Sequence, residues 1–214
     1  MSQRTTGVHA VLSHPRAYQA YQRMVGSHRL WRHIIDELAL PPGGRLLDIG
    51  CGPGDVVEYL GDVDYVGFDL SESYIDQAEE RFGHLPNRRF FAADASTVEP
   101  DEIGPVHAVL AHGVLHHVSD EIATGVFDLG SRVLAEGGAM ITVDGCYADG
   151  QSRAAKFLLD QDRGRHVRTA DEYVALAARH FAEVSIDVRT DLLRIPYTMA
   201  VLRASGPLGG AATG

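Results

Sequence analysis

The segment LLDIGCGPGD, residues 46–55, constrains this chain more than any other feature. Residues 45–50 are nearly all apolar and predict a short buried strand, and residues 55–60 begin a helical pattern. A strand, a glycine-rich turn and a helix in this order are the usual context of a cofactor-binding loop. Glycines permit a tight turn and close approach of the backbone to a ligand. The exposed N–H groups at the start of the following helix favour an anionic or polar partner.

Apolar segments and helical patterns alternate along the rest of the chain, which implies right-handed crossovers and a mostly parallel sheet covered on both faces. We therefore expect an α/β fold, a Rossmann-like doubly wound sheet with an antiparallel last strand and an N-terminal helical cap. Thr169 and Glu172 form a capping box before one helix, and Ser119 caps another. The predicted strands are 45–50, 65–70, 88–93, 106–111, 139–143, 184–188 and 199–202, and the predicted helices include 14–40, 55–60, 72–82 and 169–181.

Composition narrows the class of protein. The 214 residues carry a formal net charge of −10, which disfavours a nucleic-acid partner because phosphate backbones would be repelled. No apolar run approaches the roughly 20 residues of a membrane-spanning helix, and the N-terminus shows no secretory signal. Cys51 and Cys146 form neither a disulfide framework nor a metal-ligand spacing. These features favour a soluble cytoplasmic protein without a metal, a nucleic-acid partner or a membrane partner.

The glycine turn departs from the dinucleotide pattern G-x-G-x-x-G. Its third glycine, Gly54, comes one residue too early, and Asp55 stands where the pattern requires glycine. An acid at the expected place of a pyrophosphate counts against NAD or FAD. It suits a cofactor that carries an amine and a sulfonium, and Asp48 at the end of the strand is a second acid of this kind.

Two more acids follow predicted strands at the edge where ligands bind in such sheets. Asp69 ends the second strand, where a carboxylate can accept both hydroxyls of a ribose, and Leu70 follows to pack on an adenine face. Asp94 ends the third strand and is placed to accept an adenine amino group. Taken singly, Asp69 and Asp94 could equally be helix caps or turn formers, and the glycine turn could be a mere strand–helix connection.

Taken together, these motifs resemble those of the class I S-adenosylmethionine (SAM)-dependent methyltransferases over roughly residues 40–205. The segment HGVLHHVSD, residues 112–120, also resembles that family's stretch after the fourth strand. The resemblance implies methyl transfer from SAM to a small-molecule acceptor at oxygen or nitrogen, with S-adenosyl-L-homocysteine (SAH) as product. The cofactor-binding residues it implies are Asp48, Gly50, Cys51, Gly52, Gly54, Asp69, Leu70, Asp94, Ala95 and His112.

The same resemblance implies a domain plan. Residues 1–40 are expected to form a helical cap or lid, and residues 41–205 the SAM-binding methyltransferase domain. Residues 147–168 interrupt the sheet pattern and are expected as an insertion on the substrate side. Residues 206–214 lack bulky side chains except Leu208 and predict a disordered tail.

Histidines after the fourth strand are the candidate catalytic bases, because histidine titrates near neutral pH. His112 directly follows the strand, and His117 matches a histidine common in small-molecule members of the family. Catalysis and a capping role are equally open for His117, whereas His116 is interpreted as a supporting residue. No carboxylate has the spacing to complete a metal site with these histidines.

Two groups of residues are candidates for acceptor binding. Arginines in the insertion, Arg163 and Arg168, would bind a carboxylate or phosphate if the acceptor is anionic. The alternative for them is a surface turn paired with nearby aspartates. Aromatic side chains that would line the pocket are Tyr18 and Tyr21 of the N-terminal helix, Tyr147 and Tyr197. Aromatic residues at helical spacing are more often core residues.

Other functions remain open on the same fold. The first rivals are an NAD-dependent oxidoreductase, which the shifted glycine disfavours, and an enzyme that uses SAM without external methyl transfer, such as a SAM cyclase. Another is a non-catalytic SAM-binding protein. A nucleic-acid methyltransferase is disfavoured because the place of its [DN]-P-P-[YF] motif reads AHGVLHH here.

Overall fold

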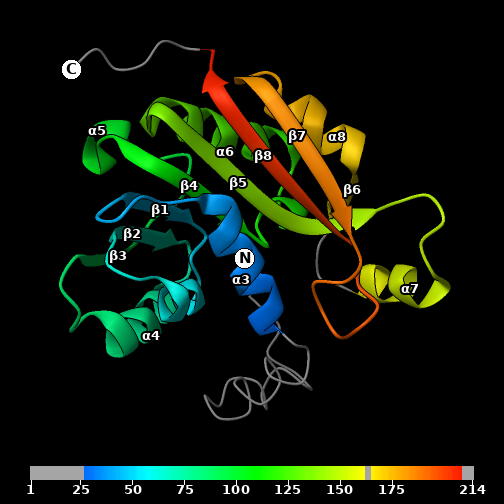
Figure 1. Cartoon of the computed structure of the whole chain (residues 1–214), viewed down its shortest axis with the longest axis horizontal. Helices are drawn as coiled ribbons and strands as arrows, with labels where there is room; N and C mark the ends of the chain where they lie inside the picture. The colour runs from blue at the N-terminus through cyan, green and yellow to red at the C-terminus, as the bar shows by residue number, and fades with distance from the viewer. Residues whose placement is uncertain (1–26, 162–164, 209–214) are drawn as a thin grey trace.

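The computed structural model describes residues 27–161 and 165–208, and within them the predicted Rossmann-like α/β fold is confirmed (Figure 1). An eight-stranded sheet has the order β3-β2-β1-β4-β5-β8-β7, and β6 pairs with the end of β5. The strands are β1 (Arg45–Ile49), β2 (Asp64–Asp69), β3 (Arg88–Ala92), β4 (Val106–His112), β5 (Leu134–Tyr147), β6 (Arg168–Thr169), β7 (Phe181–Arg189) and β8 (Met199–Pro207).

Strand directions follow the prediction of a mostly parallel sheet. The pairs β1–β2, β2–β3, β1–β4 and β4–β5 are parallel. The last strand, β8, is antiparallel to both of its neighbours, β5 and β7. The carboxyl ends of β1, β2, β4 and β5 therefore meet at one edge, where open α/β sheets bind ligands.

Helices cover both faces of the sheet, because the side chains of its central strands alternate between two buried cores. On β4, Leu110 belongs to one core and Val109 to the other. One core is covered by α3, η1 and α4, and the other by α5, α6 and α8; Figure 1 shows α3 in front of the sheet with α6 behind it. The helices are α3 (Ser27–Leu38), η1 (Asp55–Tyr59), α4 (Glu72–Phe82), α5 (Pro100–Ile103), η2 (Leu115–His117), α6 (Asp120–Val133), α7 (Arg153–Gln161) and α8 (Ala170–Ala177).

Several element boundaries differ from the prediction. The helix expected from residue 55 is a single 3₁₀ turn, η1, and the strand expected over 139–143 extends over Leu134–Tyr147. The insertion after β5 contains α7 and the two-residue strand β6. Residues 1–26 of the predicted cap and 209–214 of the predicted tail lie outside the described residues. No helix within the described ranges is long and apolar enough to cross a membrane.

Candidate functional site

The glycine turn between β1 and η1 is hydrogen-bonded to the end of β2. Its three glycines have φ values of 72°, 53° and 75°, in the left-handed region that other residues rarely adopt. The N–H groups of Gly50 and Cys51 donate to Phe68 O at 2.8 and 3.0 Å, and Gly52 N–H donates to Asp69 Oδ2 at 3.0 Å. The turn is thus held in place by both the backbone and the terminal carboxylate of the neighbouring strand.

The glycines of the turn differ in what surrounds them. A Cβ on Gly50 would lie 2.5 Å from Cγ2 of Val114, so the turn packs directly on the loop after β4. A Cβ on Gly52 would meet nothing within 4 Å. The turn therefore leaves open space beside Gly52, where a ligand could approach the backbone closely.

Asp69 and Leu70, at the end of β2, have the exposure expected of ligand-binding residues. Asp69 accepts one hydrogen bond on each oxygen, from Gly52 N and from Ser71 N at 2.8 Å. Since a carboxylate oxygen has two acceptor sites, both oxygens keep capacity for ribose hydroxyls. The side chain of Leu70 is 74% exposed, which leaves an apolar surface beside the turn.

Asp94 and Ala95 follow β3. Asp94 is exposed, and its Oδ1 accepts hydrogen bonds from Ser96 N at 2.9 Å and Ser96 Oγ at 2.7 Å. These bonds hold the pKa of the Asp94 carboxyl below its usual range. Ala95 packs against the core on the α6 side. Asp94 thus stays ionised, and its second oxygen, Oδ2, offers further acceptor sites.

Asp48 is buried at the end of β1 and is bound by a residue that the sequence reasoning missed. The hydroxyl of Tyr65 donates to Asp48 Oδ2 at 2.8 Å. Gly67 lies opposite Asp48 in the sheet, and a Cβ there would lie 2.6 Å from the Tyr65 oxygen. Gly67 therefore allows the tyrosine to cross over its own strand. Burial raises the pKa of Asp48 to about 7 despite this hydrogen bond.

Asp55 forms an ion pair with Arg81 of α4. Its Oδ1 is 2.7 Å from Nη1 of Arg81, which also donates to Pro53 O, while Nη2 of Arg81 bonds Glu58 at 2.6 Å. This ion pair anchors η1 to α4. Cys51 of the glycine turn is buried, and burial raises the pKa of its thiol, so it stays a neutral small side chain.

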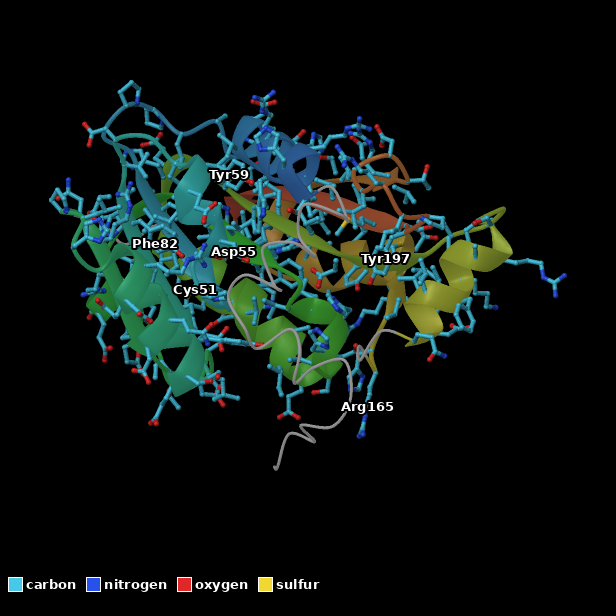
Figure 2. The ribbon with its side chains drawn as sticks, turned by 90° about the horizontal axis from the view of Figure 1, so that it is seen from below. Cys51, Asp55, Tyr59, Phe82, Arg165 and Tyr197 are labelled. Atoms are coloured by element: carbon cyan, nitrogen blue, oxygen red, sulfur yellow. The ribbon has the colours of Figure 1, made fainter. Side chains whose placement is uncertain are left out.

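A pocket of about 200 Å³ lies at the carboxyl ends of β4 and β5, beneath α3 and beside the segment between β7 and β8. Gly113 of its lining directly precedes Val114, which contacts Gly50, so the pocket adjoins the cofactor turn. The lining residues are Ser27, Leu30, His112, Gly113, His116, Val143, Asp144, Gly145, Leu193, Tyr197 and Met199. In the view of Figure 2, Cys51 and Asp55 lie to the left of Tyr197, which lines the pocket.

His112 lines this pocket at the end of β4. Its ring centroid lies 4.8 Å from that of Trp31 on α3, at 59°. Burial lowers the pKa of His112 to about 4, so the ring is neutral at pH 7. His112 is therefore suited to contact a cationic cofactor but is a weak base.

His116 and Asp144 form a buried pair in the same pocket. Nδ1 of His116 lies 2.8 Å from Asp144 Oδ1, and the backbone N–H of His116 donates to the same oxygen at 3.2 Å. The sequence reasoning missed Asp144, although an acid inside the apolar run of β5 was a visible signal. His117 is exposed and outside the lining of the pocket; its ring centroid lies 4.0 Å from that of His116.

Arg168 and Tyr147 have protein partners. All five N–H donors of Arg168 are used, because its guanidinium bonds the carbonyls of Leu115, Val118 and His166 and, twice, Asp120 Oδ1. An anionic acceptor would have to displace one of these bonds. Tyr147 donates from its hydroxyl to Asp160 Oδ1 at 2.8 Å.

Of the other predicted acceptor-binding residues, Tyr197 lines the pocket. Tyr18, Tyr21 and Arg163 lie outside the described residues. Among the residues that the structure describes, no three histidine, cysteine or acidic side chains are grouped so as to hold a metal ion.

Residues 46–138 match a family described as a methyltransferase domain. The chain is 28% identical over 187 residues to phosphoethanolamine N-methyltransferase 3 of Arabidopsis thaliana. The alignment covers 85% of this chain and 37% of that protein. It is 33% identical over 93 residues to trans-aconitate 2-methyltransferase of Variovorax paradoxus, covering 42% of this chain and 34% of that protein. The chain thus spans about a third of the length of these relatives.

The fold has solved counterparts. One is phosphoethanolamine N-methyltransferase 2 of Haemonchus contortus in complex with phosphomonomethylethanolamine and S-adenosylhomocysteine, with a TM-score of 0.72. The superposition covers 92% of this chain and 58% of that chain at 17% identity, a likeness that concerns the fold.

Proposed function

We propose that the chain is a class I SAM-dependent methyltransferase that transfers a methyl group from SAM to a small-molecule acceptor at oxygen or nitrogen. The observation that carries the proposal is the contact between Gly50 and Val114, which joins the cofactor turn to the pocket at the ends of β4 and β5. Two ligands bound on either side of this contact would be neighbours.

The residues around the turn fit the cofactor of this family, SAM. The open side of Gly52 admits a ligand, Asp69 keeps acceptor capacity on both oxygens, and exposed Leu70 offers an apolar face. When bound, SAM supplies an electrophilic methyl group on a sulfonium. We propose that Asp69 holds its ribose, Leu70 and Ala95 its adenine ring, and Asp94 its adenine amino group.

The acceptor side of the proposal rests on the pocket. Its volume of about 200 Å³ suits a small molecule, and the side chains of Leu30, Val143 and Met199 give it apolar walls. Such walls exclude water and hold an acceptor in line with the methyl donor, which contributes to the rate by orientation. Trp31 on α3 packs on His112, which lines the pocket.

Isothermal titration calorimetry tests the cofactor assignment. SAM is expected to bind the wild-type chain in the micromolar range, and Asp69→Ala is expected to weaken binding strongly. Asp69→Asn keeps an acceptor for only one of the two backbone N–H groups, those of Gly52 and Ser71, and is expected to weaken SAM binding less than Asp69→Ala does. Absence of SAM binding, or binding of NAD in its place, would overturn the proposal.

Turnover is then tested with methyl-labelled SAM and a panel of small alcohols, phenols and amines. Transfer of label to an acceptor with release of SAH supports the proposed reaction. Labelled SAM that is consumed without an acceptor would indicate intramolecular chemistry, and binding without any product would indicate a SAM-binding protein; either contradicts the proposal.

A further inference from the structure

The buried pair of His116 and Asp144 is placed where an acceptor would bind. Both residues line the pocket next to the cofactor turn, and their side chains are 7% and 1% exposed. Asp144 stands near the carboxyl end of β5 and His116 in η2, so the pairing depends on two rigid elements. Asp144 Oδ1 accepts from both the backbone N–H and the ring of His116, which fixes the orientation of the imidazole.

Among the described residues, His116 supplies both hydrogen bonds that Asp144 accepts. The second carboxylate oxygen, Oδ2, is buried and has no hydrogen-bond partner among the described residues. None of the described residues that line the pocket is lysine or arginine. A buried carboxylate with this environment stabilises an imidazolium beside it, as in the aspartate–histidine pairs of hydrolases. It also disfavours an anion in the pocket.

The neighbouring histidines are less suited to accept a proton from an acceptor. His112 has a pKa lowered to about 4 by burial, so at neutral pH it is a weak base. His117 is exposed and lies outside the lining of the pocket. His116 alone among the three both lines the pocket and contacts a carboxylate.

We propose, on the basis of the proposed function, that His116 is the residue that accepts the acceptor's proton, with Asp144 as its positioning residue. The pocket then takes an uncharged, mainly apolar alcohol, phenol or amine and not an anionic acceptor. As the bond from the acceptor oxygen or nitrogen to the methyl carbon forms, the sulfur–methyl bond breaks and its electron pair stays on sulfur. The acceptor's proton passes to the His116 imidazole, which becomes an imidazolium paired with Asp144.

Binding is tested by NMR on protein with ¹³C,¹⁵N-labelled histidine, in complex with SAH. The probes are phenol, anisole and benzoate, which share a ring and differ in a donor, its methylation and a negative charge. Phenol is expected to shift the His116 signals, assigned with His116→Gln, and to bind about tenfold or more tighter than anisole, because one hydrogen bond to a charged or polarised group is lost. Benzoate is expected to leave these signals unchanged.

Asp144→Asn separates a positioning role from a purely structural one. In the wild type, the ¹⁵N shifts of His116 are expected to show Nδ1 protonated and held to Asp144; the variant is expected to lose this tautomer preference and most of the preference for phenol over anisole. His84→Gln, at an exposed loop position, is the control and is expected to change neither.

Each result bears on one claim. Benzoate binding as tightly as phenol, equal binding of phenol and anisole, or an unchanged tautomer in Asp144→Asn would overturn the inference. So would loss of methyl transfer in His117→Gln with normal transfer in His116→Gln, on any acceptor found. SAH that fails to bind at all would instead overturn the proposed function.

Discussion

At the scale of single residues, the cofactor end of the site depends on an unusual crossing of a side chain over its own strand. Tyr65 reaches Asp48 only because Gly67, between them on the sheet surface, has no side chain. The Asp48 carboxyl has lost its hydration on burial, and the hydrogen bond from the tyrosine hydroxyl replaces a bond to water.

Gly67→Ala is expected to destabilise the protein by about 1–3 kcal/mol, the usual cost of overpacking, because the new Cβ would lie 2.6 Å from the Tyr65 oxygen. Urea denaturation measures this change. The matched control is Gly125→Ala in α6, where a Cβ meets nothing within 4 Å and alanine favours the helix by about 0.5–1 kcal/mol. Equal effects of the two substitutions would contradict the crossing geometry.

Asp48 makes folding stability depend on pH. Its pKa rises from 3.8 to about 7 on burial, so between these values the folded state keeps a proton that the unfolded chain has lost. Its contribution to stability therefore falls as pH rises from about 4 to about 7 and is constant above. Asparagine cannot ionise, so the stability of Asp48→Asn relative to the wild type is expected to rise by about 3 kcal/mol between pH 5 and pH 8, because about two pH units of this window lie below the pKa of about 7.

The measurement is the free energy of unfolding of both proteins at pH 5 and pH 8, without cofactor. The difference between variant and wild type is the relevant quantity, because other titrating groups cancel in it. A difference that is the same at the two pH values would show that Asp48 does not titrate in this window.

Residues that follow directly after a strand in the chain could be placed at the site from the sequence. The glycine turn, Asp69 and Leu70 follow strands directly, so their place at the sheet edge could be predicted. Tyr65 bonding Asp48 and Asp144 bonding His116 could not, because each pair joins residues on separate elements through the register of the sheet or a loop fold. A single sequence does not indicate which polar residues on separate elements meet.

At the scale of elements, Arg168 connects three of them. Its side chain bonds carbonyls at η2 and after it, and the first turn of α6 through Asp120, while its backbone pairs with β5 in β6. The guanidinium thus fixes the loop that carries His116. The arginine was predicted as an acceptor ligand; the structure gives it a partner for every donor.

Arg168→Lys is expected to destabilise the protein by about 2–4 kcal/mol, since three ammonium donors cannot replace a planar fork of five and buried carbonyls are left unpaired. Arg179→Lys, at an exposed position after α8, is the control and is expected to change stability little. Thermal and urea unfolding measure both. If Arg168→Lys unfolds like the wild type but raises the KM for an anionic acceptor, the residue binds substrate instead.

Element boundaries were predictable where a pattern is local and less so where tertiary structure decides. The capping box of Thr169 and Glu172 is present as predicted at the start of α8. The strand over 139–143 was predicted too short, because β5 continues on both sides through pairing with β4 and β8. The helix at 55 forms only a 3₁₀ turn, as Leu60 is already in an extended conformation.

At the scale of the whole molecule, one sheet separates two cores, and the cofactor turn and pocket adjoin the core under α3. The single tryptophan of the chain, Trp31, lies in that core, whereas Phe127 of α6 lies in the other. Strands β1, β4, β5 and β8 contribute side chains to both cores. Loss of packing in one core is therefore expected to lower the stability of the other core as well.

Phe127→Ala is expected to lower the free energy of unfolding by about 3–5 kcal/mol, because it opens a cavity at a fully buried ring. Trp31 fluorescence and far-UV circular dichroism are expected to report the same midpoint, since the shared strands make the domain a single cooperative unit. SAH at about 100 times its Kd is expected to raise stability by about 2.7 kcal/mol in both the wild type and the variant, as Phe127 lies in the core on the opposite face of the sheet from α3 and η1. Separate midpoints for the two probes would show instead that the two faces of the sheet unfold independently. Loss of the SAH effect in Phe127→Ala would show that the α6 core supports the cofactor site directly.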